Sequence, residues 1–150
     1  MPYQGHIKLS WALSAILIIA VLGAIVAFVF VINEEPREKF TEFYILSDSG
    51  KASGYPADLE VGSPAEVILG VVNREQEPAS YIIEIRIDGV KIGELGPIVL
   101  EHNGKSEEPV SFTADKPGEH QKVEFILYRQ GQAEADESLH LWVNVKSRRD

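Results

Sequence analysis

The sequence predicts an all-β protein, an immunoglobulin-like antiparallel β-sandwich, preceded by a single N-terminal transmembrane helix. Two observations indicate the helix and the sheets. Leu9–Ile32 contains 24 residues without one charged side chain. After it, about eight short segments of alternating apolar and polar residues are separated by turn residues every 8–12 positions, which is the pattern of a sandwich. In addition, no helical periodicity follows Ile32, which indicates that the rest of the chain is all β.

The apolar stretch is long enough to cross a bilayer. As a helix it would reach roughly 36 Å, compared with about 30 Å for the hydrocarbon core. A secretory signal has an apolar core of only about 7–15 residues and ends at small residues, whereas Phe28–Ile32 places bulky side chains there. We therefore expect a retained anchor, with membrane lipid as a partner.

One side of this helix carries small residues. Ala20, Gly23, Ala24 and Ala27 recur at spacings of three and four, so they share a face that permits close approach of another helix. Transmembrane helices are rich in alanine in general, so the pattern also fits a helix without a partner. The more specific interpretation is a docking face for other transmembrane subunits.

The predicted organisation is a tail at 1–8, the transmembrane helix at 9–32, a charged stalk at 33–39, the β-sandwich at 40–146 and a tail at 147–150. Pro36 ends the helix because proline cannot continue it. The expected strands are Phe40–Leu46, Glu66–Asn73, Tyr81–Ile87, Val90–Leu95, Ile98–Leu100, Val110–Ala114, Gln121–Tyr128 and Leu139–Val145, and Ala57–Val61 is expected to be a short extended piece.

Individual strands carry further information. Glu66–Asn73 is apolar on both faces and is therefore expected at the centre of a sheet. Asp88-Gly89 joins two strands directly and predicts a hairpin turn. In Leu139–Val145, the odd-numbered residues are expected inward, with His140 and Trp142 outward.

Composition excludes several classes of function. The chain has a formal charge of −9, and removing Lys8, the one charged side chain before Asn33, leaves −10 on the remainder. Such an acidic surface argues against binding nucleic acid. Because there are no cysteines, disulfides, thiolate catalysis and cysteine metal sites are excluded.

The candidate interaction surface consists of Tyr128, His140 and Trp142. His140 and Trp142 lie two apart on one strand face, and an outward tryptophan offers apolar contact together with a polar group. The alternative is that Trp142 packs under the acidic loop at 130–138 or against a neighbouring strand.

No catalytic, metal or cofactor site is predicted. The four histidines, His6, His102, His120 and His140, lack ligand spacing. Acidic residues that offer oxygen ligands to calcium match no dedicated calcium loop; they are Glu107, Glu108, Glu134, Asp136 and Glu137. No Gly-x-Ser-x-Gly elbow supports a hydrolase. We expect a protein that is not an enzyme and has no cofactor.

Segments spread over nearly the whole soluble part resemble a known family, the C-terminal domain of archaeal and bacterial membrane proteins described as domain of unknown function 1616. The matching segments are Phe40–Leu46, Gly50–Ala52, Gly54–Pro56, Val71–Glu75, Lys116–Glu119, Gln121–Tyr128 and Ser138–Val143. The resemblance implies a membrane-tethered extracytoplasmic β-sandwich from a prokaryote, and it implies no reaction. Longer relatives carry several transmembrane helices before this domain, whereas this sequence has one.

The expected function is a structural one, an accessory subunit of a larger membrane complex. The alternatives are a free-standing surface module that binds carbohydrate, peptide or envelope polymer, and a filament subunit of the pilin or archaellin type. The positive charges flanking the helix are nearly balanced, Lys8 and the amino terminus against Arg37 and Lys39. Supported partly by the resemblance, we expect the N-terminus in the cytoplasm and the domain outside.

Overall fold

The computed structural model describes residues 5–33 and 38–148, and the chain divides into two compact units, Met1–Arg37 and Glu38–Asp150. The predicted stalk and the two predicted tails therefore lie partly outside the described residues. Within the first unit, helix α1 spans Gly5–Asn33. Trp11–Ile32 is long and apolar enough to cross a membrane, with a mean hydropathy of 3.3. Its side chains are exposed all round the helix.

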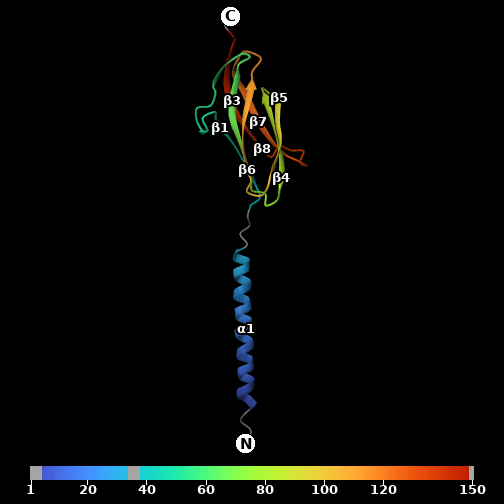
Figure 1. The fold of residues 1–150 in the computed structure, drawn as a ribbon. Helices are drawn as coiled ribbons and strands as arrows, with labels where there is room; N and C mark the ends of the chain where they lie inside the picture. The colour runs from blue at the N-terminus through green and yellow to red at the C-terminus, as the bar shows by residue number, and fades with distance from the viewer. Residues whose placement is uncertain (1–4, 34–37, 149–150) are drawn as a thin grey trace. The chain divides into compact units, whose positions relative to one another are not determined.

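The second unit is an immunoglobulin-like β-sandwich, as predicted (Figure 1). One sheet has the order β1-β3-β6 and the other has the order β2-β8-β7-β4-β5. The strands are β1 (Thr41–Ser47), β2 (Asp58–Glu60), β3 (Pro64–Asn73), β4 (Ala79–Ile87), β5 (Val90–Leu100), β6 (Lys105–Thr113), β7 (Gly118–Arg129) and β8 (Glu137–Lys146).

The structure differs from the expected strands in three places. The segments expected at 90–95 and 98–100 form one strand, β5, whose register against β4 shifts where the cis Gly96–Pro97 peptide lies. Proline is accommodated there because β5 is at the edge of its sheet. Strand β6 begins at Lys105, earlier than expected. Strand β2 pairs with β8 in parallel, whereas the other pairs are antiparallel as predicted.

Two local predictions are confirmed. The strand expected to be central, β3, lies between β1 and β6. Asp88 and Gly89 both have positive φ, 47° and 80°, as a tight two-residue hairpin turn requires. The Asp88 carboxylate also accepts a hydrogen bond from the Lys122 backbone N–H at 2.9 Å, which ties this turn to β7.

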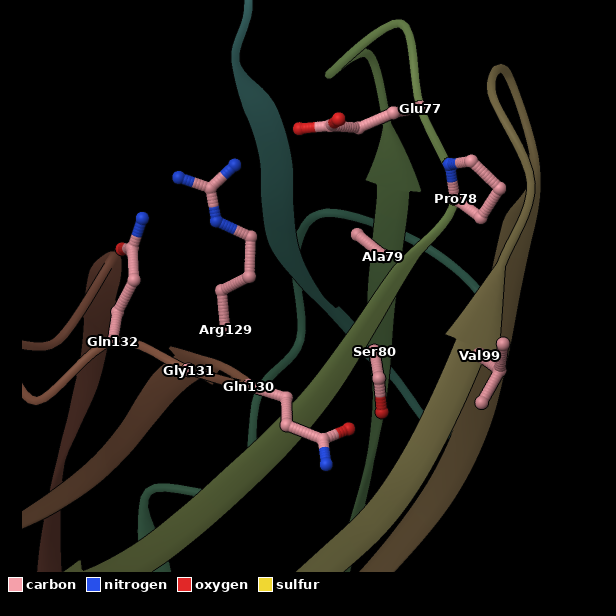
Figure 2. Close-up of a pocket in the computed structure, with 9 residues that line it drawn as sticks. All are labelled: Glu77, Pro78, Ala79, Ser80, Val99, Arg129, Gln130, Gly131 and Gln132. Carbon is pink, nitrogen blue, oxygen red and sulfur yellow. The ribbon is translucent and has the colours of Figure 1, made fainter.

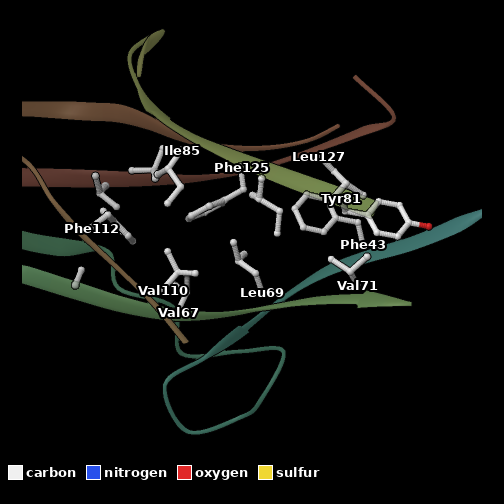
Figure 3. Packing of buried hydrophobic residues seen from close by; sticks show 14 of the residues in the cluster. Phe43, Val67, Leu69, Val71, Tyr81, Ile85, Val110, Phe112, Phe125 and Leu127 are labelled. Atoms are coloured by element: carbon white, nitrogen blue, oxygen red, sulfur yellow. The ribbon is translucent and has the colours of Figure 1, made fainter. Parts of the chain in front are cut away.

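The core forms between the inner faces of the two sheets (Figure 3). Leu69 from one sheet and Ile83, Phe125 and Leu127 from the other are fully buried. Phe112 packs edge to face on Phe125, with ring centroids 6.0 Å apart. The alternation of buried and half-buried residues along β4 and β7 is the one that their sequences predict.

Candidate functional site

The structure brings two of the three predicted surface residues together. His140 and Trp142 lie on the outer face of β8, and their rings meet edge to face with centroids 5.8 Å apart. Trp142 is 54% exposed. Tyr128 is half-buried and lies on β7, the strand next to β8. His140 pairs with Glu124 of β7, and Tyr128 is four residues further along that strand. At about 3.3 Å per residue this separation is roughly 13 Å, so Tyr128 is not part of the aromatic pair.

Charged residues beside the aromatic pair are already paired with one another. Lys122, opposite Trp142, contacts Glu124 at 2.6 Å. Further across the sheet, Glu84 contacts Arg86 at 2.6 Å, and Lys91 contacts Glu94 at 2.6 Å. These pairs lie at the surface, where ion pairs contribute little to stability, but they satisfy the charges of this face. His140 and Trp142 therefore offer an exposed aromatic contact surface beside charged side chains that already have partners.

A buried polar network, which the sequence did not predict, lies at the end of the core where β1 begins. The Glu75 carboxylate is buried and contacts the Arg129 guanidinium at 2.6 Å. It also accepts a hydrogen bond from the Thr41 hydroxyl at 3.0 Å, and that hydroxyl is 3.0 Å from the Tyr81 hydroxyl. Burial, as the main cause, raises the pKa of Tyr81. A buried charge needs such partners, so the network fixes how the ends of β1, β4 and β7 meet.

Asn73 extends the network into the loops beside it. Its fully buried side-chain amide donates to the backbone oxygens of Glu77 and Leu100, at 2.7 and 2.9 Å, and accepts from the Glu75 backbone N–H. The only signal in the sequence was the polar run that follows the apolar residues of β3 within the family-like segment Val71–Glu75. Propensity alone does not reveal that such a run is buried.

An open pocket of about 520 Å³ lies next to this network (Figure 2). Its lining consists of Glu77–Ser80, Val99 and Arg129–Gln132. The Arg129 guanidinium is engaged by Glu75, and the rest of the lining offers the Glu77 carboxylate, two side-chain amides, the Ser80 hydroxyl and small apolar groups. Figure 2 shows the Glu77 carboxylate and the Ser80 hydroxyl pointing away from each other.

The outer face of the other sheet carries an aromatic residue over a glycine. An added Cβ at Gly70 would overlap the Tyr44 ring, and the Tyr44 hydroxyl donates to the Glu107 carboxylate at 2.7 Å. Lys105 contacts the same carboxylate at 2.8 Å. Lys105 and Tyr44 together lower the pKa of Glu107, whereas burial and Glu107 raise the pKa of Tyr44. These contacts join β1, β3 and β6.

The acidic candidates for calcium binding do not converge. Glu107 is engaged by Tyr44 and Lys105, and Glu108 accepts from the Ser106 hydroxyl at 2.9 Å. Asp136 is half-buried, with one carboxylate oxygen buried and without a hydrogen-bond partner, whereas Glu134 and Glu137 are exposed. Over the described residues, no group of three or more His, Asp or Glu side chains is placed to hold a metal ion.

The three histidines of the sandwich make different contacts. His102 accepts from the Gln76 backbone N–H through Nδ1, and the His120 backbone N–H donates to Asn144. His140 contacts Trp142, and the side chain of His6 lies outside the described residues.

The small residues of α1 are exposed. A Cβ added at Gly23 would meet no atom of the chain within 4 Å. Ala20, Ala24 and Ala27 are likewise exposed, so this face is available to lipid or to another helix.

The sequence of residues 34–144 matches the family described as Domain of unknown function (DUF1616). The chain belongs to this family. A search of curated proteins found no match. The DUF1616 family assignment therefore identifies the domain without assigning it a reaction.

Among solved structures, the sandwich is similar to the CARDB domain of the PF1109 protein from Pyrococcus furiosus. The crystal structure of that domain, which is in complex with di-metal ions, is 13% identical with a TM-score of 0.53; the match covers 71% of this chain and 90% of that one. The solution NMR structure of the same domain is 14% identical with a TM-score of 0.52, covering 72% and 97%. At this level of identity the likeness supports the sandwich fold alone.

Proposed function

We propose that this protein is a single-pass membrane protein that acts as a non-catalytic accessory subunit of a larger membrane complex. In this proposal α1 is the anchor, its N-terminus is cytoplasmic, and the sandwich binds a partner on the extracytoplasmic side. The observation that carries the proposal is α1, which is apolar on all sides and exposes Ala20, Gly23, Ala24 and Ala27. Small residues let two helix backbones approach closely within a bilayer.

Gentle detergent extraction from native membranes, followed by native mass measurement and identification of co-eluting proteins, tests the proposal. We expect other membrane proteins to co-elute in fixed stoichiometry. Gly23→Ile should reduce their recovery, since the larger side chain blocks close helix approach, and a Cβ added at Gly23 lies in open space. Ala15→Ile adds similar bulk about 130° around the helix from the centre of the small-residue face, and it should leave recovery unchanged. Recovery of the unmodified chain alone would contradict the proposal.

A free-standing binding module is the second candidate, and the exposed contact between His140 and Trp142 favours it. In that case the chain would elute alone, and Trp142 fluorescence would change when the ligand, a carbohydrate, peptide or envelope polymer, is added. A pilin-like subunit would instead yield a polymer of chains that begin near Leu9, which filament imaging and N-terminal sequencing would reveal.

A further inference from the structure

We propose that the free edge of β8 over residues 138–142 binds an extended, basic segment of a partner polypeptide as an added β-strand. The inference deepens the proposed function and rests on it, because it names how the sandwich would hold a partner.

The strand position beside β8 is filled only in part. Strand β2 pairs with Asn144–Lys146, and no strand pairs on that side with residues 138–142 in the described part of the chain. The Asn144 backbone N–H points to this side, because it donates to the Ala57 oxygen at 2.7 Å. Backbone direction alternates along a strand, so the N–H and C=O groups of His140 and Trp142 point to the same side. They form a template on which another strand can pair.

Two other edge strands of the sandwich, β5 and β6, carry residues that discourage pairing. The edge strand β1 carries one charged side chain, Glu42, which contacts Arg74 at 2.9 Å. Strand β5, at the far edge of the same sheet, contains Lys91 and Pro97. Strand β6, at the edge of the other sheet, contains Pro109 together with Glu107 and Glu108. Proline and charged side chains commonly protect edge strands. The β8 segment Ser-Leu-His-Leu-Trp contains neither proline nor an acidic, lysine or arginine side chain.

A mostly apolar groove of about 500 Å³ accompanies this edge, between β8 and the edge strand β1 of the other sheet. The crossover between β1 and β2 closes part of it, since the Tyr55 hydroxyl donates to the Ile45 oxygen at 3.0 Å. The groove is lined by Phe43–Ile45, Ala52, Tyr55 and Ser138–Leu141. Leu139, Leu141 and Ile45 are only partly buried. Alternate side chains of an added strand would cover them, which would remove apolar surface from water.

Charge decides between a foreign segment and a second copy. Glu134, Asp136 and Glu137 directly precede the free edge, and the whole chain carries −9. A second copy would bring the same negative charge, whereas a segment with lysine or arginine at its ends would be attracted. The partner segment is therefore expected to alternate apolar and polar residues, with its apolar side in the groove and its other side near Trp142.

The test uses the full chain in detergent micelles and a fluorescein-labelled peptide, Lys-Val-Thr-Val-Thr-Val-Lys, with blocked ends. Fluorescence anisotropy measures binding, and hydrogen exchange locates it. We expect binding with slower exchange at the amides of His140 and Trp142. Three control peptides separate the contributions: one N-methylated on alternate residues, one with serine for valine, and one with glutamate for lysine. Each should bind about tenfold more weakly or worse.

Variants test the site itself. His140→Pro removes an N–H that points away from β7, so it should weaken binding by about tenfold or more while β7 and β8 stay paired. Because proline in a strand can disturb folding, near-UV circular dichroism accompanies this variant. Ala52→Phe provides an independent test, since Ala52 is exposed and lines the groove. Ala133→Phe, in an exposed loop outside the groove, is its matched control and should bind the peptide normally.

Equal binding of the N-methylated peptide, exchange protection at β1, β5 or β6 in place of β8, or no binding at about 1 mM would each overturn the proposal. So would a dimer protected at His140 and Trp142, because the occupant would then be a second copy. The two proposals fail separately. Co-purified subunits without protection at this edge would remove the strand-addition proposal only, and peptide binding by a chain that co-purifies with nothing would remove the accessory-subunit proposal only.

Discussion

The buried contact between Glu75 and Arg129 is the residue-scale feature on which the end of the sandwich depends. It combines a buried carboxylate, a guanidinium at 2.6 Å and hydroxyl groups of Thr41 and Tyr81 in one network. An ion pair on the surface contributes little to the free energy of unfolding. In the interior, removing one partner of a pair is strongly destabilising, because the other charge stays buried without compensation. The network therefore specifies which strand ends come together.

Arg129→Met is expected to lower the free energy of unfolding by about 3–5 kcal/mol, because it leaves the Glu75 charge buried without its cation. Denaturant unfolding followed by near-UV circular dichroism measures this change. The double variant Glu75→Gln/Arg129→Met should recover part of the loss, since no unpaired charge remains. A cost of less than about 1 kcal/mol for Arg129→Met would indicate a pair that behaves like an exposed one.

Tyr81→Phe is expected to cost about 0.5–1.5 kcal/mol at neutral pH through the lost hydrogen bond with Thr41. The pKa of Tyr81 is raised in the folded protein. The hydroxyl of Tyr81 therefore contributes fully to the free energy of unfolding below about pH 10, the pKa of tyrosine in the unfolded chain. Above that pH the unfolded chain ionises first, and stability falls as pH approaches the folded pKa. The stability difference between the wild type and Tyr81→Phe should therefore narrow in alkali.

Unfolding curves of both proteins at several pH values between about 8 and 11 check this expectation. Tyr44→Phe is the comparison variant. The pKa of Tyr44 is also raised in the folded protein, so the stability difference between the wild type and Tyr44→Phe should also narrow in alkali. A stability difference for Tyr81→Phe that stays constant with pH would contradict the role assigned to burial.

At the scale of the elements, strands β1, β3 and β6 are joined across their outer face by the Tyr44 ring over Gly70. Glycine lacks the side chain that would occupy this space, and the ring replaces it. The Tyr44 hydroxyl then reaches Glu107, and Lys105 completes the contact. One cross-strand arrangement thus supports a sheet of only three strands.

Gly70→Ala is expected to destabilise the protein by about 1–3 kcal/mol, because the added methyl group displaces the Tyr44 ring and its hydrogen bond. Thermal and denaturant unfolding measure the effect. In a Tyr44→Ala background the same change should cost little, since the space is open and alanine suits a strand better than glycine. Equal costs in both backgrounds would show that the ring is not the cause.

At the scale of the whole molecule, the chain consists of an apolar helix and a domain with its own core. The two compact units divide after Arg37. Among the described residues, the buried hydrophobic cluster is formed by side chains of the second unit.

A chain of residues 38–150 is therefore expected to fold, with a melting temperature within a few degrees of that of the full protein. Near-UV circular dichroism and calorimetry measure this, with the full chain in detergent as the control. The full chain should remain in the membrane pellet during alkaline carbonate washing, whereas the shortened chain should be released. Loss of the folded spectrum on shortening would mean that the sandwich depends on the preceding segment.

The sequence alone determined the apolar span, the all-β class and the inward faces of most strands, because all three depend on residues close together in the sequence. A long stretch without charged residues predicts a helix that can cross a membrane. The alternation of apolar and polar residues along β4 and β7 predicts which of their side chains are buried. The Asp88-Gly89 turn was predicted for the same reason, since two adjacent residues set its backbone angles.

Only the tertiary structure decided features that join distant residues. Thr41, Glu75 and Arg129 are far apart in sequence, and no local pattern indicates that they share one buried network. The parallel pairing of β2 depends on a crossover between sheets, and it leaves the neighbouring edge of β8 open. His140 and Trp142 were predicted from one strand's alternation, but their place beside an open edge and an apolar groove follows from the packing of β1 against β8.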